Sequence, residues 1–423
     1  MLLVDIFMAL SRSIDLVDHD IGNHNKRVAY IAGRIAHSMG LSTGKITKIV
    51  VAGALHDIGV LKETEYRELV QFDYKGGIDY HSLMGYRLLY SCPLTQDLAN
   101  IIKHHHVYYS EKKNIPEGNV PLAAEIIHVA DRADVLLDYK KDVLDQKNKV
   151  LNTLREYSGD RFHPDVVTCF EEIAKQESFW FDLQFNCVEK KIKSYIFYNP
   201  LLTLEELHEI AKLFTRIIDF RSRFTATHST SVAMVARSLG EMCNLSEREC
   251  LLLDIAGHLH DIGKLAIPLS ILEKPGKLSP EEWRIMKRHT YFTYQILDEI
   301  DSAEFKVINE WAALHHEKLN GQGYPFKLPG KYITMGSRIM TIADMFTALA
   351  EMRPYREGLG DDDIIDILKK ERGESLDAYI VDVLLKNYDR LKTVREQAFC
   401  DALKGFEDYF DLFKRHDWFY EYN

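Results

Sequence analysis

The chain has 423 residues, of which 46% are hydrophobic and 28% charged, and its formal net charge is −11. This profile is typical of a soluble globular protein with room for about two domains, and the acidic balance argues against nonspecific DNA binding. The six cysteines show no metal-binding spacing, which favours a reducing compartment. We see neither a signal peptide nor an apolar run of the roughly 18 residues that a membrane span needs. We therefore expect a cytoplasmic protein that binds neither DNA nor a membrane.

The local patterns predict helices along the whole chain. Residues 1–17 (MLLVDIFMALSRSIDLV) read as an amphipathic helix, and GLSTGKITKI (40–49) and NLSEREC (244–250) place Ser or Thr just before helical stretches. In LSPEEWRIMKRH (278–289), a serine is followed by a proline and, three residues on, by a glutamate, which marks a helix start. Apolar residues after His228 recur with helical spacing. These signals predict an all-α fold.

The two halves of the chain repeat one pattern. GALHDIG (53–59) and GHLHDIG (257–263) are offset by 204 residues, and chemically matched positions surround both. The matched positions are His24 with His228, His56 with His260, Asp57 with Asp261, His81 with His289, His104–His105 with His315–His316, and Asp131 with Asp344. A period of this size indicates a duplicated domain rather than a solenoid repeat. We expect two tandem helical bundles, 1–178 and 201–423, joined by an aromatic-rich connector, 179–200.

Histidine and aspartate positions that recur in the same order in both halves point to metal binding. Neutral imidazoles and carboxylates suit iron, manganese, zinc or nickel, and helical bundles build such sites from side chains that project inward. The second copy offers seven such residues, too many for one tetrahedral ion, and Asp261 is the natural bridge between two. Two neighbouring ions stabilise the attacking and leaving oxygens of a phosphoryl displacement. His258 lies on a different helix face from His260, so we do not expect it to be a ligand.

The second copy resembles the HD-GYP branch of the HD superfamily of metal-dependent phosphohydrolases. The resemblance covers roughly 205–390 and lies in HDIGKLAIPLSILEKPGKLSPEEW (260–283), HHEKLNGQGYP (315–325), IAD (342–344) and RPYR (353–356). It implies a helical bundle that carries two or three metal ions, usually iron or manganese. It also implies hydrolysis of a bacterial second messenger, cyclic di-GMP or 3′,3′-cyclic GMP-AMP, to the linear dinucleotide.

The resemblance assigns roles to individual residues. It places one metal on His228, His260, Asp261 and Asp344, and the other on Asp261, His289, His315 and His316. It places Lys264 on the substrate phosphate, Arg353 and Arg356 near a nucleobase, and Tyr324 at the pocket mouth. Members with three metals carry a glutamate where this chain has Phe224. We therefore expect two metals in this copy.

The first copy keeps the ligand pattern but loses the substrate motifs. The candidate ligands of a second metal site are His24, His56, Asp57, His81, His104, His105 and Asp131. Val60 replaces the phosphate lysine, and no GYP follows the histidine run. Asp20 is either an extra ligand or a residue of a helical first turn. Three interpretations stay open for this copy: a second phosphohydrolase such as a 5′-nucleotidase, a regulatory domain that binds metal or nucleotide without turnover, and a packing partner.

The leading hypothesis is thus a cyclic-dinucleotide phosphodiesterase with its active site in the second copy. The alternative is a receptor that binds the cyclic dinucleotide without hydrolysing it and signals to a partner protein. Whether the chain forms a homodimer stays open at this stage.

Overall fold

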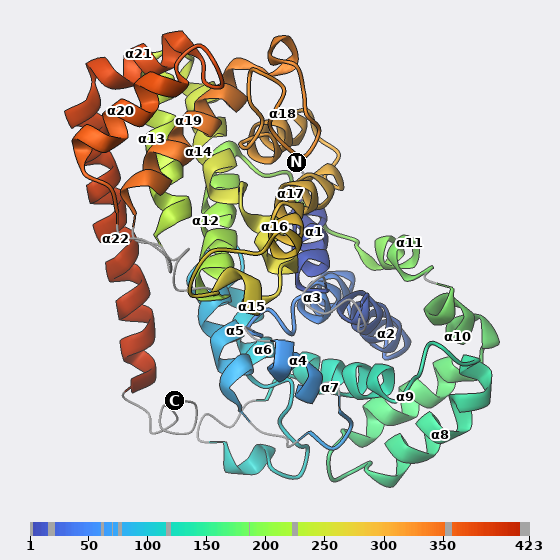
Figure 1. The fold of residues 1–423 in the computed structure, drawn as a ribbon. Helices are drawn as coiled ribbons and strands as arrows, with labels where there is room; N and C mark the ends of the chain where they lie inside the picture. Colours follow the sequence, from blue (N-terminus) through green and yellow to red (C-terminus); the bar gives the residue numbers. More distant parts are fainter. Residues whose placement is uncertain are drawn as a thin grey trace. The chain divides into compact units, whose positions relative to one another are not determined.

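The computed structural model describes residues 3–15, 22–60, 63–69, 71–74, 78–115, 120–185, 187–221, 227–351 and 358–414. Regular structure in these ranges is helical (Figure 1). Its only β features there are two isolated bridges, Ser158–Phe162 and Arg372–Leu376. The prediction of an all-α fold is confirmed. None of the helices in these ranges is long and apolar enough to cross a membrane.

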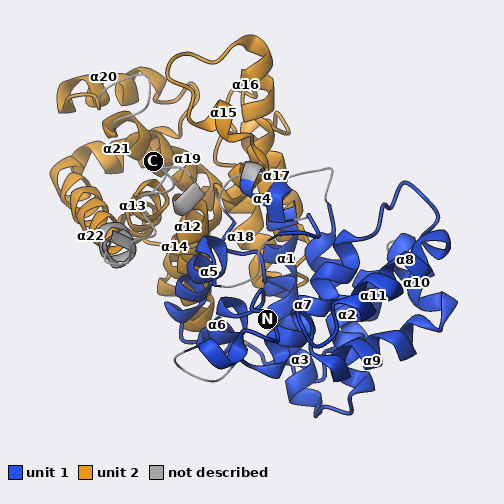
Figure 2. Cartoon of the chain, turned by 90° about the horizontal axis from the view of Figure 1, so that it is seen from below, with its two compact units in different colours: residues 1–201 blue, residues 202–423 orange. Residues whose placement is uncertain are grey.

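The chain divides into two compact units, Met1–Leu201 and Leu202–Asn423 (Figure 2). The helices of unit 1 are α1 (Leu3–Asp15), α2 (His24–Ser38), α3 (Thr43–Ala54), α4 (Glu63–Leu69), α5 (Tyr80–Tyr90), α6 (Gln96–Lys103), η1 (Lys112–Asn114), α7 (Leu122–Val135), α8 (Val143–Glu156), α9 (Pro164–Ala174), α10 (Glu177–Gln184), α11 (Val188–Ile192) and η2 (Lys193–Tyr195).

Helix α2 is central to unit 1 and contacts α1, α3, α7, α9 and α11. Its apolar residues, including Val28, Ile31 and Ile35, are buried. Burying one aliphatic side chain of this size stabilises a fold by about 1.5–3 kcal/mol. The histidine that begins α2 is therefore anchored by the core of the unit.

Part of the aromatic segment 179–200 packs into the core of unit 1, whereas Phe185, Phe197 and Tyr198 are exposed. Trp180 is fully buried, and its Nε1 donates to the carbonyl oxygen of Ala174 at 2.9 Å. Phe179 stacks on Tyr30 of α2 with ring centroids 6.0 Å apart, and α11 contacts α2. The segment that we expected to connect the two copies thus contributes to the core of the first.

The helices of unit 2 are α12 (Leu204–Arg221), α13 (His228–Met242), α14 (Glu247–Leu259), η3 (Ile262–Ala266), α15 (Leu269–Leu272), α16 (Pro280–Met286), α17 (Arg288–Asp298), α18 (Ala303–Ala313), η4 (Gly330–Tyr332), α19 (Met335–Ala350), α20 (Asp361–Glu371), α21 (Ala378–Lys386) and α22 (Tyr388–Lys414). Helix α13 contacts α14, α19 and α22.

The predicted helix starts in unit 2 are confirmed. Ser279 caps the N-terminus of α16 and Ser246 caps that of α14, each with a capping box in which the serine and the glutamate three residues later exchange hydrogen bonds. These bonds satisfy amide groups that the first turn of a helix leaves without partners.

The two units repeat the same helix pairs. Contacts of α2 with α3 and α7 in unit 1 correspond to contacts of α13 with α14 and α19 in unit 2, and α5 pairs with α6 as α17 does with α18. The two isolated bridges also lie at matching places, between α8 and α9 and between α20 and α21. The predicted internal duplication is therefore visible in the structure.

Candidate metal centre and substrate site

The predicted ligands of unit 2 come from helix ends and converge. His228 begins α13, His260 and Asp261 follow α14, and His315 and His316 follow α18. His289 and Asp344 lie within α17 and α19. Adjacent residues of a regular helix point about 100° apart, and the end of α18 is what lets His315 and His316 share one site.

Asp261 lies between two groups of ligands. Its Oδ2 is 3.1 Å from His260 Nε2 and 3.9 Å from His228 Nε2, whereas its Oδ1 is 3.6 Å from His289 Nε2. Two further distances lie within the groups: Asp344 Oδ1 is 3.1 Å from His228 Nε2, and the Nε2 atoms of His289 and His315 are 3.4 Å apart. The two oxygens of one carboxylate thus face two different histidine sets.

Glycine in the HDIG sequence brings two ligand-bearing segments together. A Cβ atom at Gly263 would overlap the carbonyl oxygen of His289, and one at Gly59 would overlap that of His81. In unit 2 the hydroxyl of Thr293 completes this contact, because it donates to the His260 carbonyl at 2.9 Å and accepts from the Gly263 amide at 3.1 Å. Glycine at this position therefore allows the turn after Asp261 to dock on α17.

Hydrogen bonds orient the ligand histidines. The Nδ1 atoms of His260, His289 and His315 lie 2.6–2.7 Å from carbonyl oxygens three residues earlier. Because Nδ1 donates there, Nε2 is the atom left to face the cluster. His228 Nδ1 lies 2.8 Å from Glu351 Oε2, a contact that the sequence analysis did not anticipate.

The electrostatics of the cluster suit a cation. Burial lowers the pKa of His289 to about 3 and that of His316 to about 4, so both rings are neutral at pH 7 and offer lone pairs. Burial also raises the pKa of Asp261, but the neighbouring His260 and Lys264 outweigh it and hold this pKa well below its ordinary value. The donor set thus combines the carboxylates of Asp261 and Asp344 with the neutral imidazoles of His289 and His316.

The side of the site expected to bind substrate is partly open. The side chain of His316 is 31% exposed, and Tyr324 packs against it with ring centroids 4.8 Å apart. Lys264 Nζ lies 2.6 Å from Asp261 Oδ2, so the lysine is already within reach of the cluster. Arg353, Arg356 and Phe224 lie outside the described residues.

Glu317 holds the loop that carries Tyr324. Its buried carboxylate accepts hydrogen bonds from the amides of Phe326, Lys327 and Leu328 at 2.7–3.0 Å. A Cβ atom at Gly323 would fall 2.5 Å from Glu317 Cα, so glycine permits the loop to lie on this backbone. The sequence HHE gives no sign of this role for its glutamate.

Unit 1 assembles a similar cluster, with one correction to the predicted register. Its distances repeat those of unit 2: Asp57 Oδ2 is 3.3 Å from His56 Nε2 and Asp57 Oδ1 is 3.9 Å from His81 Nε2. His24 Nε2 is 3.3 Å from Asp131 Oδ1. Asp20 lies outside the described residues.

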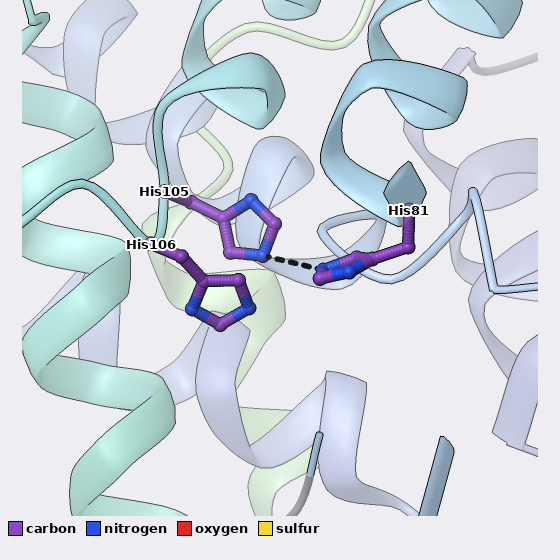
Figure 3. A group of neighbouring side chains, drawn as sticks. All are labelled: His81, His105 and His106. Carbon is purple, nitrogen blue, oxygen red and sulfur yellow. Dashed lines mark hydrogen bonds between the residues drawn. The ribbon is translucent and has the colours of Figure 1, made fainter. Parts of the chain in front are cut away.

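The histidine pair of unit 1 is His105–His106, not His104–His105. His105 has the bonds of His315, with Nδ1 2.6 Å from the carbonyl three residues earlier and Nε2 3.4 Å from His81 Nε2 (Figure 3). His106 Nδ1 is 3.8 Å from Asp131 Oδ2, as His316 is 3.6 Å from Asp344. His104 instead directs Nδ1 at the Asn100 carbonyl, 2.8 Å away. Three consecutive histidines allow two alignments, and the end of α6 selects the later one.

The site of unit 1 is closed where that of unit 2 is open. Val60, at the position of Lys264, packs with buried Tyr66 and Leu69. Arg132 pairs with Asp131 at 2.7 Å and donates to the carbonyl oxygens of Leu69 and Gln71 at 2.8 Å. The arginine thus fixes α4 and the residues after it beside the histidine cluster.

Carboxylates behind the cluster of unit 1 also went unpredicted. Asp134, one helical turn after Asp131, lies 2.8 Å from His24 Nδ1 and pairs with Arg27. Burial lowers the pKa of His24, but hydrogen bonds to Asp131 and Asp134 raise it overall to about 10. Asp79 lies 2.9 Å from His81 Nδ1. These carboxylates orient histidines as second partners do in metal sites.

Both clusters fit transition-metal ions by their donor chemistry. In unit 2, His289, His315 and His316 have ligand atoms within 4.8 Å of one another, and in unit 1 so do His24, His56 and Asp131. The Nε2 of His260 is buried and, although Asp261 Oδ2 is 3.1 Å away, it forms no hydrogen bond of good geometry among the residues described. Such an atom is costly to bury unless a cation satisfies it.

Comparisons with known proteins agree with this geometry. The HD domain family matches residues 21–136 and, separately, 212–380. The 3′3′-cGAMP-specific phosphodiesterase 1 of Vibrio cholerae is 33% identical over 393 residues, which cover 90% of each protein. The cyclic di-GMP phosphodiesterase response regulator RpfG of Xanthomonas campestris is 36% identical over 190 residues, 45% of this chain and 50% of that protein.

A solved structure shares the fold. The crystal structure of a cyclic GMP-AMP specific phosphodiesterase of V. cholerae, V-cGAP3, matches with a TM-score of 0.65 at 22% identity, over 92% of this chain and 98% of that one. HD domains are metal-dependent, in keeping with the two clusters. The chain therefore belongs to the HD-domain family that includes these phosphodiesterases, and it carries two HD domains.

Proposed function

We propose that unit 2 is a phosphodiesterase that hydrolyses a 3′,3′-cyclic dinucleotide to the linear dinucleotide, with 3′3′-cGAMP as the preferred substrate. The observation that carries the activity is Asp261, whose two oxygens face two separate histidine sets. The substrate preference is supported by the relative named for 3′3′-cGAMP, which matches through both HD domains. RpfG, a relative named for cyclic di-GMP, matches 45% of this chain.

The ligand sets support two divalent ions, iron or manganese, in unit 2. One would be held by His228, His260, Asp261 and Asp344, and the other by Asp261, His289, His315 and His316. Nickel or zinc would also suit these donors. When bound, two such ions supply positive charge at the attacking and leaving oxygens of the phosphodiester.

The chain's own residues bind and orient the substrate. Lys264 Nζ is placed to leave Asp261 and donate to a nonbridging phosphate oxygen, where it stabilises the charge that develops during displacement. Tyr324, held by the loop on Glu317, offers a ring for stacking or a hydroxyl for the phosphate. Arg353 and Arg356 are proposed to contact a nucleobase, where a guanidinium can pair with a guanine edge.

Turnover assays with the purified full chain test this proposal. With Mn²⁺ or Fe²⁺ added, 3′3′-cGAMP should be linearised faster than cyclic di-GMP, and Asp261→Ala should abolish the reaction. A receptor without hydrolytic activity would bind the dinucleotide and return it intact. Intact substrate after long incubation with metal-loaded protein would refute the proposed phosphodiesterase activity.

For unit 1 the structure favours metal binding without turnover. All seven residues of its cluster are buried, and Val60 stands where unit 2 has the phosphate lysine. Arg132 already pairs with the carboxylate of Asp131. These features leave little room for a phosphate ester, so we propose that unit 1 regulates or stabilises the chain rather than acting as a nucleotidase. Asp57→Ala should then form the same products from the dinucleotide as the parent. If the variant no longer cleaved the linear product further, unit 1 would be an enzyme.

A further inference from the structure

A second group of buried ligand-type side chains lies in unit 2, apart from the cluster around Asp261. His208 comes from α12, and Asp254 and His258 come from α14. Their ligand atoms lie within 4.8 Å of one another. Asp254 and His258 are buried, whereas the His208 side chain is 17% exposed. The proposed hydrolysis makes no use of these three residues.

The distances within this group match the edges of a tetrahedral metal site. Asp254 Oδ1 is 3.2 Å from His208 Nε2 and 3.4 Å from His258 Nε2. With metal–ligand bonds of about 2.0–2.1 Å, tetrahedral ligand atoms lie about 3.3 Å apart. His208 Nε2 and Asp254 Oδ1 are buried, yet neither has a hydrogen-bond partner of good geometry within the described ranges. Both atoms therefore face the same space, 3.2 Å from each other as an ion pair but without the geometry of a hydrogen bond.

Neighbouring residues aim the remaining atoms into that space. Thr215 Oγ1 lies 3.0 Å from the His258 carbonyl oxygen and 2.9 Å from His258 Nδ1. Because the hydroxyl has one hydrogen, donating it to the carbonyl leaves its oxygen to accept from Nδ1–H, and Nε2 then presents its lone pair to Asp254. Arg237 donates to Asp254 Oδ2 at 3.2 Å, which leaves Oδ1 as the ligand atom.

The duplication supplies an internal comparison. At an offset of 204 residues, the positions of His208, Asp254 and His258 are held in unit 1 by Val4, Val50 and Ala54, all buried. A Cβ at Gly33 would meet Val50 just as Arg237, at the matching position, meets Asp254, which fixes the register of α13 and α14. For α12, the buried Asp219 matches the buried Asp15 of α1 at the same offset. The HD bundle thus folds with an apolar core here, and the fold alone does not require three ligand-type residues in unit 2.

We propose that His208, Asp254 and His258 bind a zinc ion that joins α12 to α14. Two imidazoles and one carboxylate are a common zinc donor set, and zinc takes four ligands. A water molecule would take the fourth position. The site would fix the end of α14, two residues before His260, and so support the geometry of the neighbouring cluster.

The zinc content of the full chain tests the proposal when the three residues are replaced by their counterparts from unit 1. The triple variant His208→Val, Asp254→Val, His258→Ala restores the apolar set, and after saturation with Zn²⁺ alone and gel filtration it should retain one zinc fewer per chain than the parent. His208→Gln is a milder second variant, because its side chain is partly exposed. It should show the same loss while keeping the circular dichroism spectrum and melting behaviour of a folded chain.

The background variant Asp261→Ala separates this site from the proposed active site. Adding His208→Gln to Asp261→Ala should remove one further zinc per chain, and zinc-edge anomalous diffraction of Asp261→Ala crystals should show a peak between α12 and α14. Equal zinc contents with and without His208→Gln, or crystals without that peak, would overturn the proposal. Neither measurement depends on turnover, so a failed phosphodiesterase assay would not contradict the zinc site.

Discussion

Replacing Glu317 with alanine should impair substrate hydrolysis without removing metal. Glu317 is buried next to the ligand His316, yet its oxygens bond to three backbone amides of the loop and not to the cluster. The variant therefore separates loop order from metal binding. Glu317→Gln keeps an acceptor but loses the charge, and it should fall between the parent and the alanine variant.

The size of the effect follows from the three bonds. A hydrogen bond to a charged group contributes about 1.5–3 kcal/mol when buried. Phe326 and Lys327 are exposed, so water replaces part of two of these bonds, while Leu328 is half-buried. We take about 1 kcal/mol for each exposed bond and ~1.5 kcal/mol for the third, roughly 3–4 kcal/mol in all. If about half of this free energy holds the loop in the position that binds substrate, its loss lowers kcat/KM by roughly 10–30-fold.

The assay is kcat/KM for 3′3′-cGAMP, with metal content and a urea unfolding curve measured on the same preparation. Glu317→Ala should keep the metal content of the parent. A kcat/KM equal to that of the parent would refute the role of the loop. A loss of metal that accounts for the lost activity would show instead that Glu317 supports the cluster directly.

The remaining predictions concern a phosphate contact, a buried ion pair and a thiol. Lys264→Met should lower kcat/KM by at least about 100-fold with metal content unchanged, whereas the same change at exposed Lys306 should have no effect on hydrolysis. Arg27→Met removes the guanidinium from buried Asp134, which keeps its contact with His24, and should reduce the free energy of unfolding by about 3 kcal/mol. Removing exposed Arg372, also paired with an aspartate, should change it by less than about 1 kcal/mol, and equal urea midpoints for the two variants would contradict this reasoning. Burial raises the pKa of Cys243 from 9.0 to about 11, so its stabilising contribution is complete below pH 9 and lost as the pH rises toward 11, a loss that Cys243→Ala should abolish in pH-dependent unfolding curves.

Much of the site was predictable because metal ligands must be particular residue types in a particular order. The duplication made that order visible twice, and the all-α fold followed from helical spacing and caps such as Ser279. The register of His104–His106 was not predictable, because only the end of α6 decides which two of three histidines turn inward. Partners such as Glu351 and Asp134 also escaped detection, since a carboxylate behind a histidine has no fixed spacing from it. The closure of unit 1 depends on Arg132 reaching carbonyl oxygens some 60 residues away in the chain, a contact that no local pattern encodes.

The glycine of the HDIG sequence has a consequence for the classification of related genes. At both Gly59 and Gly263 a larger residue would overlap the backbone of the next ligand-bearing helix. Selection for folding alone therefore preserves this glycine in a domain whether or not that domain turns over substrate. A search that counts HDIG would score this chain as two enzymes. The residue that follows the tetrapeptide, Val60 in one domain and Lys264 in the other, is the position that distinguishes a scaffold from a proposed catalyst.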